Sequence, residues 1–168
     1  MRQSTRLAVI GLMLTSIMIT GCSTKEEAAH EVETHNVQQT AANGDLQETT
    51  SGADKLPGFL DQQPEILQTA YSTAASVKDI LVNIPCYCGC GESAGHNSNL
   101  NCFIKEVKPD GSIVWDDHGT RCDVCVNTTM TTAELHKQGK SVKEIRAIID
   151  QTYGNGQYAK PTPTPEPV

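Results

Sequence analysis

Apolar residues recur every three or four positions in the middle of the chain. That spacing places them on one face of a helix, and it predicts a helix that begins after Pro64 and runs to about Asn83. Pro85 then ends the element, because proline cannot continue a helix. The apolar face comprises Ile66, Leu67, Ala70, Tyr71, Ala74, Val77, Ile80, Leu81 and Ile84.

Further along the chain, the pattern changes to a weak alternation of apolar and polar residues. It covers residues 102–107, is followed by the turn sequence Lys-Pro-Asp-Gly-Ser at 108–112, and continues through residues 113–115. Alternation on both sides of a turn is typical of paired strands. We therefore expect a short β-hairpin here.

Two more helices are predicted towards the end of the chain. Residues 131–134 and 141–144 each begin with Thr or Ser and end with Glu, which is the spacing of a capping box at a helix N-terminus. Gly139 is suited to ending the first of these helices in a left-handed cap, and Gly154 is suited to ending the second in the same way. The buried face of the last helix is expected to hold Ile145, Ile148, Ile149 and Tyr153.

The N-terminus carries the pattern of an export signal. Arg2 and Arg6 are followed by an apolar run over residues 7–19, too short for a comfortable membrane span. The run ends in Ile-Thr-Gly-Cys, with the cysteine at Cys22, and this resembles the lipobox of bacterial lipoproteins. The resemblance implies a signal peptide at residues 1–21, lipid on Cys22, and a protein anchored to the outer face of the cell membrane.

The segments at the two ends of the mature chain differ from its middle in composition. Residues 22–55 are polar with almost no large apolar side chain, which predicts a disordered tether. Residues 159–168 alternate proline with other residues and predict an extended, solvated tail. Between them, residues 56–158 are expected to form one domain: mainly α, small and cysteine-centred, with a short β-hairpin.

Composition excludes several classes of function. The net charge of −7 argues against a nucleic-acid partner. No glycine-rich phosphate loop or nucleophile elbow occurs, so we expect neither a bound nucleotide nor a conventional hydrolase. Val126 follows Cys125 where covalent haem c attachment would require histidine, so no haem c is expected. An enzyme is the less favoured class overall.

Six cysteines remain after Cys22, and their spacing is the most informative feature of the domain. They are Cys86, Cys88, Cys90, Cys102, Cys122 and Cys125. The first three lie in a Pro-Cys-Tyr-Cys-Gly-Cys sequence, where glycines allow a curved loop to turn alternate sulfurs inward. The last two are separated by two residues, a spacing that suits one metal ion or a redox disulfide.

The Pro85-to-Cys90 sequence resembles a family of bacterial lipoproteins named for a PCYCGC motif. The likeness continues through a set of single positions up to the final helix: His96, Cys102, Trp115, His118, Cys122 and Cys125. That family has no established biochemical activity. The resemblance therefore implies family and location, and leaves function open.

We favour a metal-binding function for the cysteines. Thiolates gathered in one place, with His96 and His118 near in sequence as further ligands, prefer a soft ion such as Cu(I) or Zn(II). The expected ligand set is the six cysteines and these two histidines, with copper favoured over zinc. A partner protein that exchanges metal or thiol equivalents is expected with it.

Two alternatives stay open. Cys122 and Cys125 at the start of a helix would have lowered pKa values and could exchange disulfides with a partner. Alternatively, six cysteines could form three disulfides that stabilise a small exported domain as a structural or interaction module without metal. The second alternative requires one loop to reach three distant partners, because cysteines two residues apart rarely meet disulfide geometry.

Overall fold

The structure is a computed structural model, and it describes residues 37–167. All of them belong to one compact unit, Glu33–Val168. The predicted signal peptide and Cys22 lie outside the described residues and stay predictions. Among the helices that are described, none combines the length and the apolar composition needed to cross a membrane.

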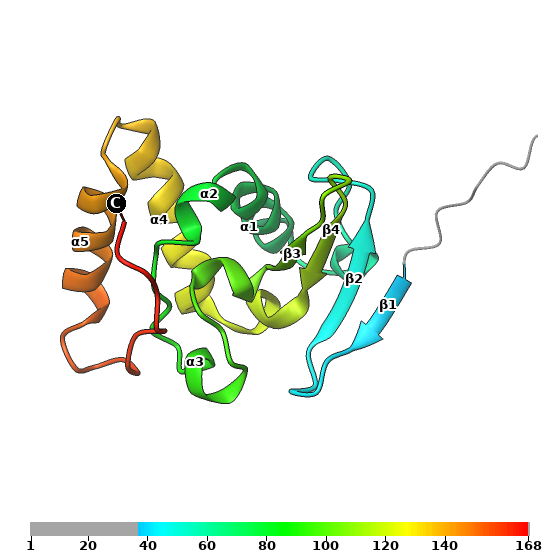
Figure 1. The fold of residues 1–168 in the computed structure, drawn as a ribbon, viewed down its shortest axis with the longest axis horizontal. Helices are drawn as coiled ribbons and strands as arrows, with labels where there is room; N and C mark the ends of the chain where they lie inside the picture. Colours follow the sequence, from blue (N-terminus) through cyan, green and yellow to red (C-terminus); the bar gives the residue numbers. More distant parts are fainter. Residues whose placement is uncertain (1–36, 168) are drawn as a thin grey trace, which may run out of the picture. The chain divides into compact units, whose positions relative to one another are not determined.

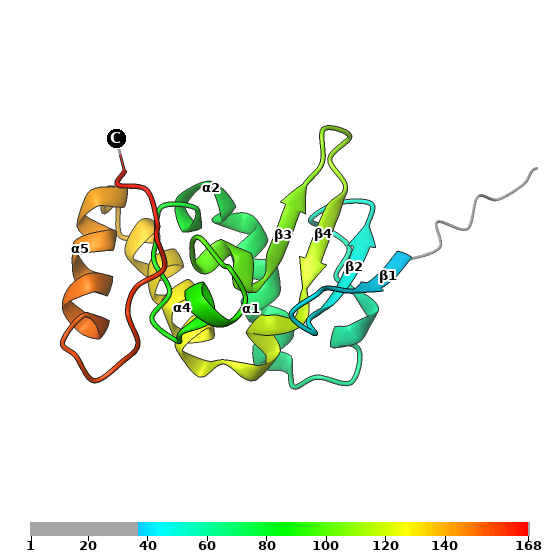
Figure 2. The ribbon, with the colours of Figure 1, turned by 60° about the horizontal axis from the view of Figure 1, so that its bottom comes forward.

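A four-stranded antiparallel sheet lies beside the helices (Figures 1 and 2). The strands are β1 (Val37–Thr40), β2 (Leu46–Thr50), β3 (Ile104–Val107) and β4 (Ile113–Asp116), in the order β1-β2-β4-β3. The predicted hairpin is confirmed as β3 and β4. The prediction of a mainly α domain is wrong, because 45% of the described residues are helical and 13% lie in strands, so that the fold is mixed α/β.

Strands β1 and β2 form a hairpin within residues 37–50, where the sequence predicted a disordered tether. That prediction is wrong here because polar side chains, rather than large apolar ones, attach the hairpin to the domain. The buried carboxylate of Glu48 accepts a hydrogen bond from the backbone N–H of Gly58 at 2.7 Å. Trp115 Nε1 donates to Thr50 Oγ1 at 2.8 Å across 65 positions of sequence. Composition alone gives no sign of such distant partners.

The helix that the apolar stripe predicts is present, but it is divided into two helices. It forms α1 (Glu65–Ser76) and α2 (Lys78–Leu81), separated by Val77 at φ −115° and ψ 22°. Leu81 and much of the rest of the stripe are buried, as expected. The remaining helices are α3 (Cys90–Ser93), α4 (Asp123–Lys137) and α5 (Val142–Tyr153), with short 3-10 helices η1 (Gly58–Leu60), η2 (Asn99–Cys102) and η3 (Asp117–Arg121).

The starts of α4 and α5 test the two predicted capping boxes. The box at residues 141–144 is confirmed, with Ser141 and Glu144 each bonding the other's backbone. The box at 131–134 is wrong, because α4 begins at Asp123 and those residues lie in its interior. Between the helices, Gly139 has the predicted left-handed conformation with φ +82°. The same prediction for Gly154 is wrong, because this residue follows α5 with φ −78°. Cys122, rather than Thr131, stands at the N-terminus of α4, and this places two thiols at a helix start.

The aromatic core surrounds Tyr71 of α1. Its ring centroid lies 5.0 Å from Phe103, 5.7 Å from Phe59 and 6.1 Å from Trp115. Gly119 is packed against this group so closely that an added Cβ would lie 2.7 Å from a ring carbon of Phe103. The core therefore joins the helices to the sheet just beside Cys102, which precedes Phe103.

The C-terminal segment (residues 159–167) is extended, but it is not a solvated tail. It runs beside α5 and along the loop that precedes α3 (Figures 1 and 2). Thr162 is 3% exposed; its N–H donates to Cys86 O at 3.0 Å, and its hydroxyl accepts from the Cys86 N–H at 2.9 Å. The prediction of a free tail is wrong because Thr162 and Thr164, which alternate with prolines, supply the polar groups that proline lacks.

Candidate metal centre

Residues 85–90 form a tight loop between α2 and α3. Gly89 has φ +94°, a left-handed conformation that glycine adopts without strain, and Cys90 begins α3 directly after it. On the other side of the loop, Ile84 O accepts a hydrogen bond from Asn99 N–H at 2.8 Å. The loop is thereby curved back towards η2, and its three thiols turn to the domain interior.

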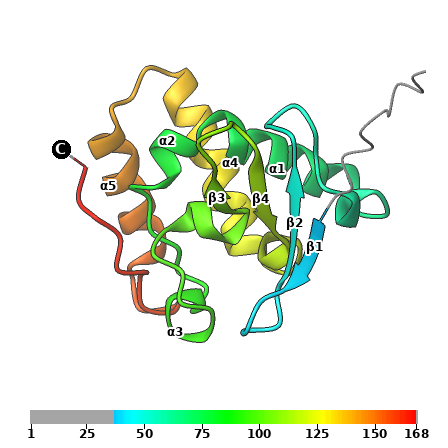
Figure 3. The ribbon, with the colours of Figure 1, turned by 45° about the vertical axis from the view of Figure 1, so that its right-hand side comes forward.

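The other three thiols come from η2 and from the start of α4. Cys102 ends η2, Cys122 precedes α4, and Cys125 lies in its first turn. Asn99 connects the two elements: its side chain donates to Cys125 O at 3.3 Å and accepts from Thr129 Oγ1 at 2.7 Å. Figure 3 shows η2 and the loop before α3 in front of α4.

The sulfur atoms converge on Cys125. Its Sγ lies 3.2 Å from that of Cys102, 3.3 Å from Cys86 and 3.6 Å from Cys88. Cys86 and Cys88 are 3.4 Å apart, and Cys90 lies 3.7 Å from Cys102. Four sulfurs on one tetrahedral zinc ion, with Zn–S bonds near 2.3 Å, would be separated by about 3.8 Å. The thiols are therefore already as close together as ligands of shared ions.

All six cysteines of the described residues are free thiols. The sulfur separations exceed the disulfide bond length of about 2.05 Å by more than an ångström. The alternative of three structural disulfides therefore has no bridge to support it among the described residues.

The six thiols, which we call the thiol cluster, are buried on one side and partly open on the other. Cys86, Cys102 and Cys125 are fully buried and Cys90 is 1% exposed. Cys88 and Cys122 are half-buried. An ion or a thiol reagent therefore reaches the cluster on the side of Cys88 and Cys122.

The thiols of the cluster differ in the direction in which their pKa values are shifted. Hydrogen bonds from neighbouring thiols, above all Cys102, lower the pKa of Cys88 and of Cys90. The pKa values of Cys86 and Cys125 are raised, first by their hydrogen bonds to Cys102, and burial raises that of Cys102 itself. In the metal-free cluster, some thiols are therefore thiolates that accept hydrogen bonds from neighbouring S–H groups, and the others keep their protons. A cation that binds to all of them has to displace those protons.

Both predicted histidines lie at the edge of the cluster. His96 is 5% exposed, and its Nδ1 lies 3.5 Å from Cys102 Sγ. The ring of His118 contacts that of His96, with centroids 4.8 Å apart. A hydrogen bond with the Cys88 sulfur raises the pKa of His118 to about 9. The sequence correctly predicted that these two histidines lie close to the thiols.

Three groups of three sulfurs each lie within 4.8 Å of one another and could hold a metal ion. They are Cys86/Cys88/Cys90, Cys86/Cys102/Cys125 and Cys88/Cys122/Cys125. Three of the six sulfurs belong to two groups each. Two adjacent ions would therefore share sulfurs.

Comparison with known proteins identifies the family. A family model described as "Protein of unknown function with PCYCGC motif" matches residues 11–167, nearly the whole chain. The chain belongs to the PCYCGC family. No curated protein and no solved structure matches it.

In this member of the PCYCGC family, the motif supplies three of the six sulfurs and the backbone that the C-terminal segment holds. Cys86 bonds Thr162 through both its N–H and its carbonyl, and Tyr87 O accepts from Ala159 N–H at 3.1 Å. The motif is thus a loop fixed at both of its faces, with sulfurs inside and the C-terminal segment outside.

A carboxylate beside the histidines of this PCYCGC protein was not predicted from the sequence. Asp45, at the end of the β1–β2 turn, is 3% exposed and lies 3.2 Å from His118 Nδ1 through its Oδ2. It also pairs with Arg121. The signal was present: Asn43-Gly44 is a strong hairpin turn sequence, and it would have moved Asp45 from the predicted tether into a sheet.

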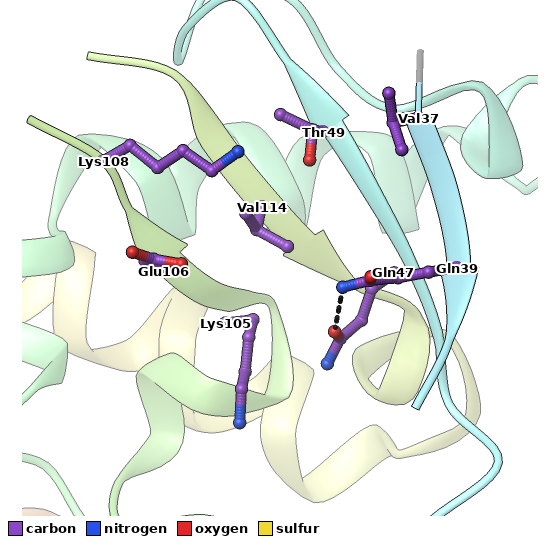
Figure 4. A pocket seen from close by; sticks show the side chains of 8 residues that line it. All are labelled: Val37, Gln39, Gln47, Thr49, Lys105, Glu106, Lys108 and Val114. Atoms are coloured by element: carbon purple, nitrogen blue, oxygen red, sulfur yellow. Dashed lines mark hydrogen bonds between the residues drawn. The ribbon is translucent and has the colours of Figure 1, made fainter. Parts of the chain in front are cut away.

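A separate cavity of about 420 Å³ lies on the face of the sheet that points away from the helices (Figure 4). It is lined by Val37, Gln39, Gln47, Thr49, Lys105, Glu106, Lys108 and Val114. None of these side chains is a cysteine or a histidine, so this cavity lacks soft metal ligands.

Proposed function

We propose that this protein binds Cu(I) through the thiol cluster as a small multinuclear centre. The observation that carries the proposal is the set of three overlapping three-sulfur groups, in which Cys86, Cys88 and Cys125 each belong to two groups. Soft thiolates select Cu(I) and zinc over hard ions, and Cu(I) accepts low coordination numbers. Bridging by shared sulfurs lets six thiolates serve more than one ion.

A single zinc ion fits the cluster less well. A closed structural zinc site uses four ligands, so two of the six thiols would be left over within bonding range. Buried thiolates without a cation are costly, since burial disfavours the charged form. Several Cu(I) ions neutralise more of the negative charge of the six thiolates, and every sulfur then binds an ion.

The test is an anaerobic titration of the reduced protein with Cu(I) in competition with a chromophoric Cu(I) chelator. We expect more than one Cu(I) per chain, and we expect saturation to protect all six thiols from alkylation. Cys125→Ser removes a shared sulfur and is expected to lower the number of bound ions. Cys122→Ser is the matched variant, because Cys122 belongs to one group only and its loss should lower the affinity more than the number.

Saturation at one Cu(I) per chain, or thiols that alkylate as fast with Cu(I) as without it, would contradict the proposal. Parallel titration with Zn(II) separates the two ions. One tightly bound Zn(II) that leaves two thiols reactive would replace the copper centre by a mononuclear zinc site.

The membrane location is part of the same proposal. Lipid on Cys22 would hold the cluster at the outer face of the cell membrane, where it would take metal from, or pass it to, a partner protein. Labelling with an alkyne analogue of palmitate tests this. We expect label on the wild-type chain and none on Cys22→Ala, which should leave the membrane fraction. Label that persists in Cys22→Ala would refute lipidation at this residue.

A second candidate function is thiol–disulfide exchange. It is supported by Cys122, which is half-buried, stands at the N-terminus of α4, and has a pKa lowered by its hydrogen bond with Cys125. A reversible potential for the Cys122/Cys125 pair, together with a mixed disulfide trapped by Cys125→Ser, would favour it. Absence of such a trapped species would leave metal binding as the function.

A further inference from the structure

The two histidines contact the thiol cluster on one side and two buried carboxylates on the other. His96 Nε2 lies 4.0 Å from Asp45 Oδ2, and His118 Nδ1 lies 3.2 Å from the same oxygen. One ligand atom from each of Asp45, His96 and Asp116 falls within a 4.8 Å group, and all three residues are at most 5% exposed. No sulfur belongs to this group, although the two histidines also form a group of this kind with Cys90 of the thiol cluster.

We propose that Asp45, His96, His118 and Asp116 form a second metal site, distinct from the thiol cluster, for a divalent ion of borderline softness such as Zn(II). Ligand bonds of about 2.0–2.1 Å to nitrogen and oxygen separate tetrahedral donors by about 3.3 Å. The distances of 3.2 and 4.0 Å to Asp45 Oδ2 lie close to that separation. Nitrogen and oxygen donors suit Zn(II), whereas Cu(I) prefers sulfur.

Residues around the site hold its ligands in place. Asp116 Oδ2 accepts from Gln47 Nε2 at 2.9 Å, and Asp116 Oδ1 accepts from the His118 N–H at 3.0 Å. Arg121 pairs with Asp45 at the surface side. Hydrogen bonds of this kind hold the carboxylates in a fixed orientation, as outer hydrogen bonds do for the ligands of known metal sites.

The site has its own opening to solvent. A cavity of about 200 Å³ is lined by His96 and Asp116, and its walls come from the β1–β2 turn, Ala94 and Lys105. It shares Gln47 and Lys105 with the cavity on the sheet face shown in Figure 4. A hydrated ion can therefore reach the second site without passing the side of Cys88 and Cys122.

The His96 ring separates the two sites. Its Nδ1 faces Cys102 and its Nε2 faces Asp45, so one ring contacts a sulfur of the cluster and an oxygen of the second site. A histidine that binds an ion through Nε2 keeps Nδ1 as a hydrogen-bond donor to the sulfur. Occupation of the second site would thereby fix His96 against the cluster.

The test uses Co(II), whose spectrum reports its ligands, on reduced protein with and without prior saturation by Cu(I). We expect one Co(II) per chain in the Cu(I)-saturated protein, with visible ligand-field bands and without the near-ultraviolet bands of thiolate-to-Co(II) charge transfer. Asp45→Asn should weaken Co(II) binding by about tenfold or more. It should leave the Cu(I) stoichiometry unchanged, because Asp45 contributes no sulfur.

Asp54→Asn is the matched control, since it removes an exposed carboxylate near β2 and should bind Co(II) as the wild type does. Thiolate charge-transfer bands in the Cu(I)-saturated protein, or no Co(II) bound at all, would overturn the second site. Failure of the thiol cluster to bind Cu(I) would be seen separately in the chelator titration. The Co(II) spectrum would then still decide whether nitrogen and oxygen donors bind the ion.

Discussion

Thr162→Val removes one hydroxyl from the C-terminal segment while keeping its shape. In the wild-type chain that hydroxyl accepts the Cys86 N–H at 2.9 Å, and both residues are buried. The variant leaves this N–H without an acceptor beside the thiol cluster. Thr164 Oγ1, which lies 2.8 Å from the lost hydroxyl, keeps the carbonyl of Asn97 as a partner. The perturbation is therefore confined to the start of the PCYCGC loop.

The expected size follows from the cost of an unpaired buried donor. Such a group destabilises the folded state by about 1–3 kcal/mol. The same free energy favours local opening, in which the loop leaves the C-terminal segment and water reaches the Cys86 N–H. Because each 1.4 kcal/mol is a factor of ten, a loss of about 2 kcal/mol raises the open population about 30-fold.

Thiol alkylation measures that population. The metal-free, reduced protein is treated with iodoacetamide under native conditions, and the modification of Cys86 is followed by peptide mass spectrometry. If the loop recloses faster than it is alkylated, the rate follows the open population, so Thr162→Val should react about 30-fold faster at Cys86. Thr162→Ser is the control, because it keeps the hydroxyl and loses only a methyl group.

Two results would refute this reasoning. Equal rates for Thr162→Val and wild type would mean that the C-terminal segment does not hold the loop. Equal acceleration in Thr162→Ser would mean that packing of the methyl group, rather than the hydrogen bond to Cys86, is what matters.

Other predictions follow from single contacts. Gly119→Ala should lower the free energy of unfolding by about 1–3 kcal/mol in urea titration, because its Cβ would overlap Phe103; an unchanged midpoint would contradict the packing. Hydrogen bonds from Ser141 lower the pKa of Glu144 in the folded protein. The ionised carboxylate therefore stabilises the fold fully above pH 4.5, and this stabilisation is lost as the pH falls through the lowered pKa. Acid titration of helix content should show this loss in the wild type but not in Glu144→Gln. Cu(I) uptake should release protons, so the apparent affinity should fall as pH is lowered; an affinity independent of pH would argue against thiol ligands.

Features with a local signal were predicted from the sequence. The stripe that forms α1 and α2 follows from its own spacing, and the capping box of α5 from Ser141 and Glu144. The inward turn of Cys86, Cys88 and Cys90 was predicted from the glycines of their loop. Each of these inferences needed only neighbouring residues.

Features that depend on distant polar partners were missed. The β1–β2 hairpin has few large apolar side chains, and Glu48 and Thr50 attach it to residues 10 and 65 positions away. Asp45 was missed for the same reason. The C-terminal segment resembled a linker in composition, because nothing local shows that Thr162 pairs with Cys86. Low hydrophobicity therefore predicted disorder where hydrogen bonds provide order.

The pairing of the C-terminal segment with the PCYCGC loop joins residues 76 positions apart. Contacts of such long range close late in folding, since they pay the entropy of a large loop before they gain from it. In the unfolded chain, the six sulfurs are ordinary, separately exposed thiols that an oxidant can cross-link at random. Refolding this domain under air and under nitrogen should therefore yield different products, although the native fold to be reached is the same under both conditions.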